Sequence, residues 1–190
     1  MPGFRRTNVL LLSLLLLVGC QASGGSQAES TPGRAPLCAV FFSPHGGCTD
    51  EVVRELAAAR AHVLVQAYSF TSQPIARALA EAHRRGVKVE VILDKSQRRE
   101  RYTAAALLAR AGVPVEIDAA HAIAHNKVMV IDGNTVLTGS FNFTESAEKR
   151  NAENLLVVRD PVLAAQYAGN WQAHRAHSTP YAGEQSGGTP

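Results

Sequence analysis

The chain has 190 residues, of which 46% are hydrophobic and 18% are charged, and its formal net charge is +3 at pH 7. A charge this small does not by itself indicate a nucleic-acid-binding protein, because binding to phosphates depends on where the basic residues lie. The length suits one ordinary domain with extra terminal segments, and the sequence contains no internal repeat.

The N-terminus has the features of an export signal. Arg5 and Arg6 precede an apolar run at residues 9–18, which is too short to span a membrane. The run ends in LVGC at residues 17–20, which resembles a bacterial lipobox. We therefore expect residues 1–19 to be a lipoprotein signal peptide and Cys20 to be lipidated, in an exported protein anchored to a membrane of the bacterial cell envelope. The alternative is an ordinary exported protein with a fortuitous cysteine.

Two further segments are poor in apolar residues. Residues 20–36 continue from the lipidated cysteine with mostly Ser, Gly, Ala, Gln, Thr and Pro, which predicts a flexible tether. Residues 178–190 have a similar composition and predict a disordered tail. A single folded domain is therefore expected over residues 37–177.

The cysteines bear on the same compartment. If Cys20 carries a lipid, Cys38 and Cys48 remain as one possible pair, and an oxidising compartment favours a disulfide between them. A zinc site made of Cys38, His45 and Cys48 is the alternative, although it lacks a fourth ligand.

Strands and helices are predicted to alternate along this domain. The first half contains expected strands at 39–42, 63–69 and 87–93, with helices at 49–60 and 72–85. The second half contains an expected helix at 99–111, strands at 115–117, 126–131, 135–138 and 155–158, and a closing helix at 162–174. Such alternation predicts an α/β fold with a mixed β-sheet flanked by helices on both faces.

One short segment gathers most of a phosphate-handling site. His125, Lys127 and Asp132 stand in the order His-x-Lys-x4-Asp, and Asp132 begins the turn that follows the strand at 126–131. Side chains on a strand alternate between its faces, so His125 and Lys127 are expected to point the same way. The return strand at 135–138 delivers the polar residues after it to the same neighbourhood.

These residue types suit transfer at a phosphodiester. Imidazole can attack phosphorus, and Lys127 offers a compact positive charge for the phosphate oxygens. Ser140 and Asn142 can donate hydrogen bonds to the same oxygens, and Glu153 could hold the other ring nitrogen of His125. This scheme requires no metal and no other cofactor.

At this point the sequence resembles a known family. The segments HNKVMVIDG at 125–133 and GSFNFT at 139–144 are similar to the HKD motif of the phospholipase D superfamily, and in particular to small bacterial single-motif endonucleases. VLVQAYSFT at 63–71 and GVKVEVILD at 86–94 also resemble that group. The resemblance implies a catalytic domain over residues 37–177.

The resemblance also implies roles for the residues of the motif. His125 would be the nucleophile, Lys127 would clamp the phosphate, and Asp132 would brace the site rather than contact the substrate. Ser140 and Asn142 would be further phosphate ligands, with Glu153 orienting the histidine.

The family mechanism uses two histidines, whereas this chain has one motif. A homodimer would supply the second, because a two-fold axis places two copies of His125 opposite each other. An acid from elsewhere in the chain is the alternative, but none of the other histidines sits in a second motif: His45, His62, His83, His121, His174 and His177. His121 is the nearest and is expected to be solvated.

The substrate class is left open between two phosphodiesters. The first hypothesis is a non-specific, metal-independent endonuclease on DNA or RNA; the second is a phospholipase D that releases phosphatidate from membrane lipids. A non-catalytic phosphate-binding module is a third. The basic clusters at 98–101 and 149–150 could line a groove for a nucleic-acid backbone, whereas the cluster at 83–85 is better explained as a helix end.

Overall fold

The computed structural model describes residues 37–100 and 102–182. The predicted signal peptide, the lipidated Cys20, the tether before Leu37 and residues 183–190 of the predicted tail lie outside the described residues. Within the described part of the chain, no helix combines the length and the apolar character needed to cross a membrane.

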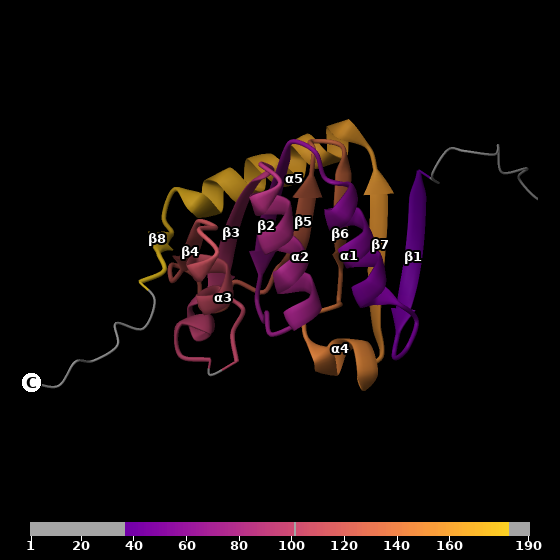
Figure 1. Cartoon of the computed structure of the whole chain (residues 1–190), viewed down its shortest axis with the longest axis horizontal. Helices are drawn as coiled ribbons and strands as arrows, with labels where there is room; N and C mark the ends of the chain where they lie inside the picture. Colours follow the sequence, from indigo (N-terminus) through magenta and orange to yellow (C-terminus); the bar gives the residue numbers. More distant parts are fainter. Residues whose placement is uncertain (1–36, 101, 183–190) are drawn as a thin grey trace, which may run out of the picture. The chain divides into compact units, whose positions relative to one another are not determined.

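An eight-stranded mixed sheet forms the centre of the domain (Figure 1), with strands in the order β1-β7-β6-β5-β2-β3-β4-β8. Strands β2, β3 and β4 are parallel, and all other neighbours are antiparallel. In chain order the elements are β1 (Cys38–Ser43), α1 (Cys48–Ala58), β2 (His62–Ala67), α2 (Gln73–Arg84), β3 (Lys88–Asp94), the 3₁₀ helix η1 (Lys95–Arg98), α3 (Ala105–Arg110), β4 (Val115–Asp118), β5 (Lys127–Ile131), β6 (Thr135–Gly139), α4 (Glu145–Lys149), β7 (Glu153–Arg159), α5 (Pro161–Arg175) and β8 (Thr179–Pro180).

Helices cover both faces of the sheet, as predicted. The larger core lies on the face of α1, α2 and α3, where alternate residues of β2 such as Val63 and Val65 are fully buried. Leu64 points to the other face and packs in a second cluster beneath α5. Helix α5 is fastened there by Trp171, whose Nε1 donates to the carbonyl of Val65 at 2.8 Å. Burial on two faces explains why the central strands are almost continuously apolar.

Two predicted elements differ in the structure. The helix expected at 99–111 is shorter: η1 ends at Arg98, and α3 begins only at Ala105. The predicted disordered tail is wrong for its first residues, because β8 pairs with β4 and the amide of Tyr181 donates to the carbonyl of Val115 at 2.8 Å. Both differences arise from long-range hydrogen bonds that local composition does not encode.

The predicted disulfide between Cys38 and Cys48 is wrong. Both thiols are free; Cys38 is exposed at the start of β1, and Cys48 is fully buried at the start of α1. Cys38 begins the six-residue strand β1, whereas Cys48 begins α1, after the loop that follows the other end of that strand. Among the described residues, the one group of side chains close enough to share a metal ion does not contain Cys38, His45 or Cys48, so the alternative zinc site is not formed. Burial raises the pKa of Cys48 to about 11, which keeps this thiol protonated.

Candidate active site

The polar residues of the motif lie at the ends of four strands, β2, β5, β6 and β7. These ends meet along one side of the sheet, which is called the site edge because the strands begin or end there. The antiparallel register pairs Ala67, at the end of β2, with Lys127, at the start of β5. Strand β6 ends at Gly139 and β7 begins at Glu153, so both place their neighbouring loops on the same edge. Five of the six predicted site residues therefore gather there: His125, Lys127, Ser140, Asn142 and Glu153.

The imidazole of His125 is exposed and rests against an aromatic side chain. Its ring centroid lies 4.6 Å from that of Tyr68, with an interplanar angle of 56°. The residue before it, Ala124, is fixed by a hydrogen bond: its amide donates to Oδ2 of the buried Asp94 at 2.8 Å. The amide of Tyr68 donates to the carbonyl of Asn126 at 2.8 Å. The ring is thus positioned from two sides while remaining accessible to a substrate.

Lys127 is buried beside His125. Its Nζ donates to the carbonyl of His125 at 3.0 Å and lies 5.2 Å from the centroid of the Tyr68 ring. Burial lowers the pKa of the Lys127 ammonium, and the carboxylate of Glu153 offsets only part of this effect. A partly desolvated cation attracts a phosphate more strongly than one in bulk water, so this position suits a phosphate clamp.

Ser140 and Asn142 follow β6 on the same edge. Ser140 is exposed, and its Oγ accepts from the backbone amide of Asn154 at 3.1 Å. Gly139 has a φ of +147°, and a side chain there would meet the carbonyl oxygen of Asn154 at 2.3 Å, so glycine is required before the serine. Oδ1 of Asn142 is buried and accepts no hydrogen bond from any described residue. Unsatisfied buried acceptors are uncommon outside functional sites.

Glu153 does not play the predicted role within one chain. Its Oε1 accepts from Nδ2 of Asn151 at 3.0 Å, and no hydrogen bond among the described residues joins it to the ring of His125. Its carboxylate instead acts electrostatically on Lys127. The local sequence placed Glu153 on the correct edge but could not specify which side chain it contacts.

Asp132 lies at the opposite end of β5 from His125. Its carboxylate accepts from the backbone amides of Arg60, Ala61 and His62 at 2.9, 2.8 and 3.0 Å, which fixes the start of β2. Burial raises the pKa of Asp132, but these three hydrogen bonds outweigh it and hold the pKa below its usual value. Asp132 therefore braces the sheet at a distance and contributes no group to the candidate site.

A groove with a basic rim adjoins His125 and Lys127. Its volume is about 470 Å³, and it is lined by Tyr68, whose ring also contacts His125 and Lys127. Lys95, Arg98 and Arg99 supply its positive charge, so Arg98 and Arg99 of the predicted cluster lie beside the site, while Arg101 lies outside the described residues. The cluster at 83–85 is a helix end, as predicted: Arg84 pairs with Glu81, and Arg85 donates to the carbonyl of Leu56. Sequence reasoning missed Tyr68 and Asp94, whose only signal is their position at the ends of predicted strands.

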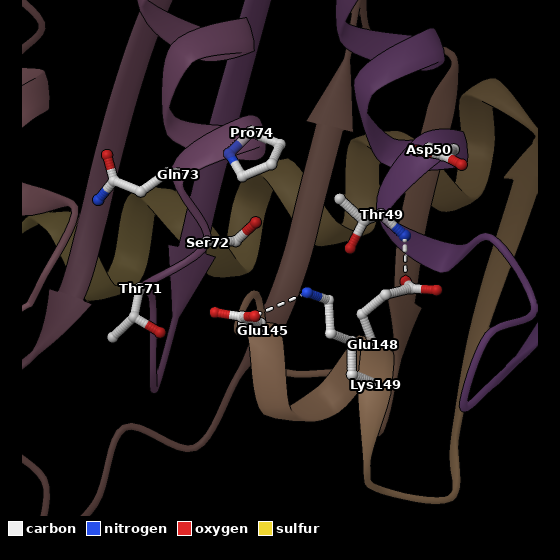
Figure 2. Close-up of a pocket in the computed structure, with 9 residues that line it drawn as sticks. All are labelled: Thr49, Asp50, Thr71, Ser72, Gln73, Pro74, Glu145, Glu148 and Lys149. Atoms are coloured by element: carbon white, nitrogen blue, oxygen red, sulfur yellow. Dashed lines mark hydrogen bonds and ion pairs between the residues drawn. The ribbon is translucent and has the colours of Figure 1, made fainter.

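A second cavity, of about 380 Å³, is not suited to phosphate (Figure 2). It lies between α4 and the N-termini of α1 and α2, and His125 and Lys127 do not line it. Three carboxylates do, from Asp50, Glu145 and Glu148. Glu148 also caps α1, because its carboxylate accepts from the backbone amide of Thr49 at 2.7 Å. Three acidic side chains therefore line the cavity, and one of them, Glu148, also stabilises the start of α1.

Comparisons with known proteins place the chain in a family. Residues 52–174 match the family model described as "Cardiolipin synthase, PLD-like domain". A "Phospholipase D" of Rickettsia conorii is 38% identical over 170 residues, covering 90% of this chain and 84% of the relative. The "Mitochondrial cardiolipin hydrolase" of Canis lupus familiaris is 34% identical over 141 residues, covering 74% and 54%.

A solved structure shares the fold. Nuc from Salmonella typhimurium, described as a phospholipase D family member, superposes with a TM-score of 0.73 at 35% sequence identity. The match covers 76% of this chain and 97% of Nuc.

Replacing Asp132 tests its bracing role. Asp132→Ala is expected to lower the free energy of unfolding by about 2 kcal/mol, because three backbone amides lose their acceptor. Since the folded pKa of Asp132 is lowered, its contribution is complete above the ordinary aspartate pKa and is lost as the pH falls through the folded value. Urea unfolding of wild type and variant at neutral and acidic pH measures both effects. A variant that kept its stability but lost phosphodiesterase activity would contradict this role.

Proposed function

The chain belongs to the phospholipase D superfamily and is a hydrolase of phosphodiester bonds, and on that premise we propose that it is a metal-independent endonuclease acting on DNA or RNA. The observation that carries the proposal is the groove rimmed by Lys95, Arg98 and Arg99 beside the exposed ring of His125. A repeating phosphate backbone needs positive charge at several positions along its path, whereas a single lipid head group needs it at one. The resemblance of the motif to bacterial single-motif endonucleases supports the same substrate.

The reaction proceeds in two displacements at phosphorus. A ring nitrogen of His125 bonds to phosphorus while the bond to the leaving oxygen breaks, and that oxygen takes a proton from His125 of the partner subunit. The partner's His125 then accepts a proton from water as the water oxygen bonds to phosphorus and the phosphorus–nitrogen bond breaks. Lys127, Ser140 and Asn142 stabilise the charge on the phosphate oxygens in both steps.

A homodimer is part of this proposal. Each chain carries one His-x-Lys motif, so one chain supplies the nucleophile but no second imidazole from a matching motif. A two-fold axis beside the exposed edge of the sheet would place two copies of His125 in one pocket. One copy of His125 would then serve as the nucleophile and the other as the acid.

Phospholipase D activity is the second candidate. It is favoured by curated relatives named "Phospholipase D" from several Rickettsia species, at 38 to 42% identity. The lipid anchor proposed at Cys20 would hold the enzyme beside such a substrate. The phosphorus chemistry is the same for both candidates, so only the substrate distinguishes them.

The nucleophile is tested by plasmid nicking in excess EDTA with the full chain and His125→Ala. Wild type is expected to nick, and the variant is expected to lose at least about 10³-fold in rate because the first displacement has no nucleophile. His62→Gln, at the opposite edge of the sheet, is the matched control and should retain wild-type activity. Substantial nicking by His125→Ala would remove this residue from the mechanism.

The same proteins distinguish the two substrates. If folded wild type fails to nick but releases the head group from phosphatidylcholine vesicles, and His125→Ala does not, the phospholipase D candidate replaces the endonuclease.

The basic groove is tested by Arg99→Ala, with Arg84→Ala as a control of equal charge. Arg99 is exposed and lines the groove, whereas Arg84 ends α2 and is paired with Glu81. For Arg99→Ala we expect KM on DNA to rise about threefold to tenfold and the salt dependence of binding to weaken by about one phosphate contact. Equal effects of the two substitutions would show that the groove does not guide the substrate.

We further propose that Cys20 is lipidated and anchors the protein to a membrane. Cys20→Ala is expected to move the protein from the membrane fraction to the soluble fraction of the producing cells, because the acyl chains provide the attachment. Nicking activity should be unchanged, since Cys20 lies far upstream of the catalytic residues in the sequence. Retention of Cys20→Ala in the membrane fraction would refute the anchor.

A further inference from the structure

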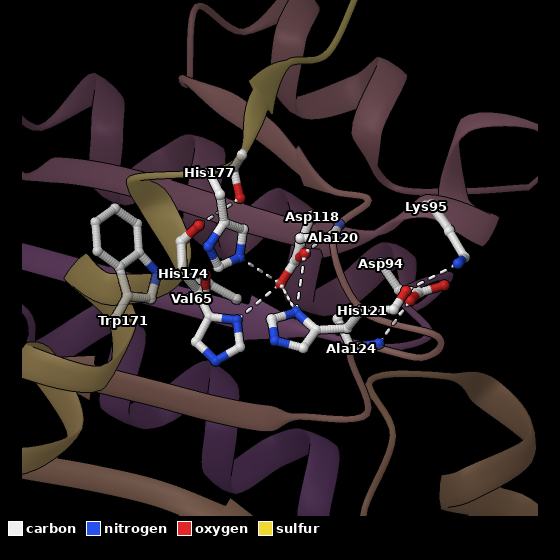
Figure 3. A network of polar contacts seen from close by, with 11 residues as sticks. Val65, Asp94, Lys95, Asp118, Ala120, His121, Ala124, Trp171, His174 and His177 are labelled. Carbon is white, nitrogen blue, oxygen red and sulfur yellow. Dashed lines mark hydrogen bonds and ion pairs between the residues drawn. The ribbon is translucent and has the colours of Figure 1, made fainter.

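A second cluster of titratable side chains lies outside the proposed catalytic residues. Asp118, His121, His174 and His177 each turn one potential ligand atom inward, and these four atoms lie within 4.8 Å of one another (Figure 3). The nearest nitrogens lie 2.9 Å (His121 Nδ1), 2.7 Å (His174 Nδ1) and 3.3 Å (His177 Nε2) from Oδ2 of Asp118. Three imidazoles from separate segments thus converge on a single carboxylate oxygen.

The surrounding fold holds three members of the cluster, Asp118, His121 and His174, in place. Asp118 is fully buried at the end of β4, and its other oxygen, Oδ1, accepts from the amide of Ala120 at 3.0 Å. The carbonyl of His121 accepts from Nζ of Lys95 at 2.8 Å. His174 sits one turn after Trp171, which fastens α5 to the sheet. The four ligand atoms are therefore largely preorganised by the fold.

We propose that Asp118, His121, His174 and His177 bind one divalent transition-metal ion of the zinc class. Three neutral imidazoles and one carboxylate form a nitrogen-rich set that suits zinc, nickel or copper, whereas calcium and magnesium prefer oxygen ligands. A tetrahedral ion with bonds of about 2.1 Å needs ligand atoms roughly 3.4 Å apart. The four atoms already lie within 4.8 Å of one another, so movements of about 1 Å would bring them to coordinating positions.

Hydrogen bonds alone would use the whole Asp118 carboxylate. Three ring nitrogens lie near Oδ2, Nδ1 of His121 also lies 3.1 Å from Oδ1, and Oδ1 accepts from the amide of Ala120. The two oxygens together offer about four lone-pair sites. Protonating all three imidazoles would place three positive charges around one negative charge. A metal ion satisfies the three nitrogens and the oxygen at once, with every imidazole neutral.

The ion would connect three parts of the chain. His121 lies in the segment between β4 and β5, four residues before His125. His174 lies in the last turn of α5, and His177 precedes β8. Four protein ligands leave no position for a substrate, which is typical of structural rather than catalytic sites. The ion would thus stabilise the C-terminal segment and the approach to His125 without acting on phosphorus.

The proposal is tested with zinc and the full chain, first stripped of metal by a chelator that is then removed. Titration with Zn²⁺ against a coloured competing chelator is expected to give one ion per chain. His121→Ala and His174→Gln should raise the Kd by roughly 100-fold or more, because each removes a ligand. His62→Gln is the matched histidine control and should bind as wild type does. Absence of zinc binding by wild type, or equal binding by His121→Ala and His62→Gln, overturns the proposal.

A second measurement locates the ion without reference to enzymatic activity. The chain contains one tryptophan, and Trp171 is adjacent to the site, so Co²⁺ bound there should quench its fluorescence. Quenching is expected in wild type and His62→Gln, and its presence in His121→Ala at the same Co²⁺ concentration would place the ion elsewhere. Circular dichroism checks folding; if His174→Gln fails to fold, His121→Ala decides, because its side chain is 46% exposed in a loop.

Discussion

The pairing of β5 between β2 and β6 is the constraint on which the rest of the structure depends. Its register sets Lys127 opposite Ala67 and brings the end of β6 to the same edge. A slip of one residue would turn Lys127 to the other face of the sheet and exchange the side chains that pack in the two core clusters. Because β5 is buried on both faces, the different packing of the two faces fixes its register, and the polar residues of the site follow from it.

The same strand separates two functions that the motif joins in sequence. His125 and Lys127 stand at one end of β5, and Asp132 stands at the other, where it binds three backbone amides. The spacing between the lysine and the aspartate is therefore the length of a strand. One end carries the two residues proposed to act on phosphate, while the other anchors the start of β2, so the motif combines a proposed chemical role with a folding role.

The carboxyl ends of the parallel strands carry a second group of polar residues on this edge. Asp94 and Asp118 are paired at the ends of β3 and β4. Asp94 holds the residue before His125, and Asp118 gathers three histidines. Ligand sites in α/β sheets commonly lie beyond the carboxyl ends of strands, where loops meet without disturbing the core. Here the segment between β4 and β5 connects the histidine cluster, the basic groove and the proposed nucleophile.

The sequence by itself determined the His-x-Lys-x4-Asp motif, the alternation of strands and helices and the mixed sheet, because apolar periodicity and turn residues act over a few positions. It also indicated that Asp132 braces rather than binds. Only the tertiary structure decided that Tyr68 contacts His125, that Glu153 contacts Asn151 and that Cys38 and Cys48 are free thiols. The cluster of Asp118 with His121, His174 and His177 was likewise visible only in the tertiary structure, because His174 and His177 lie more than fifty residues after the other two members in the sequence. Such contacts depend on strand order and register, which are set by packing across the whole sheet and leave no local pattern in the chain.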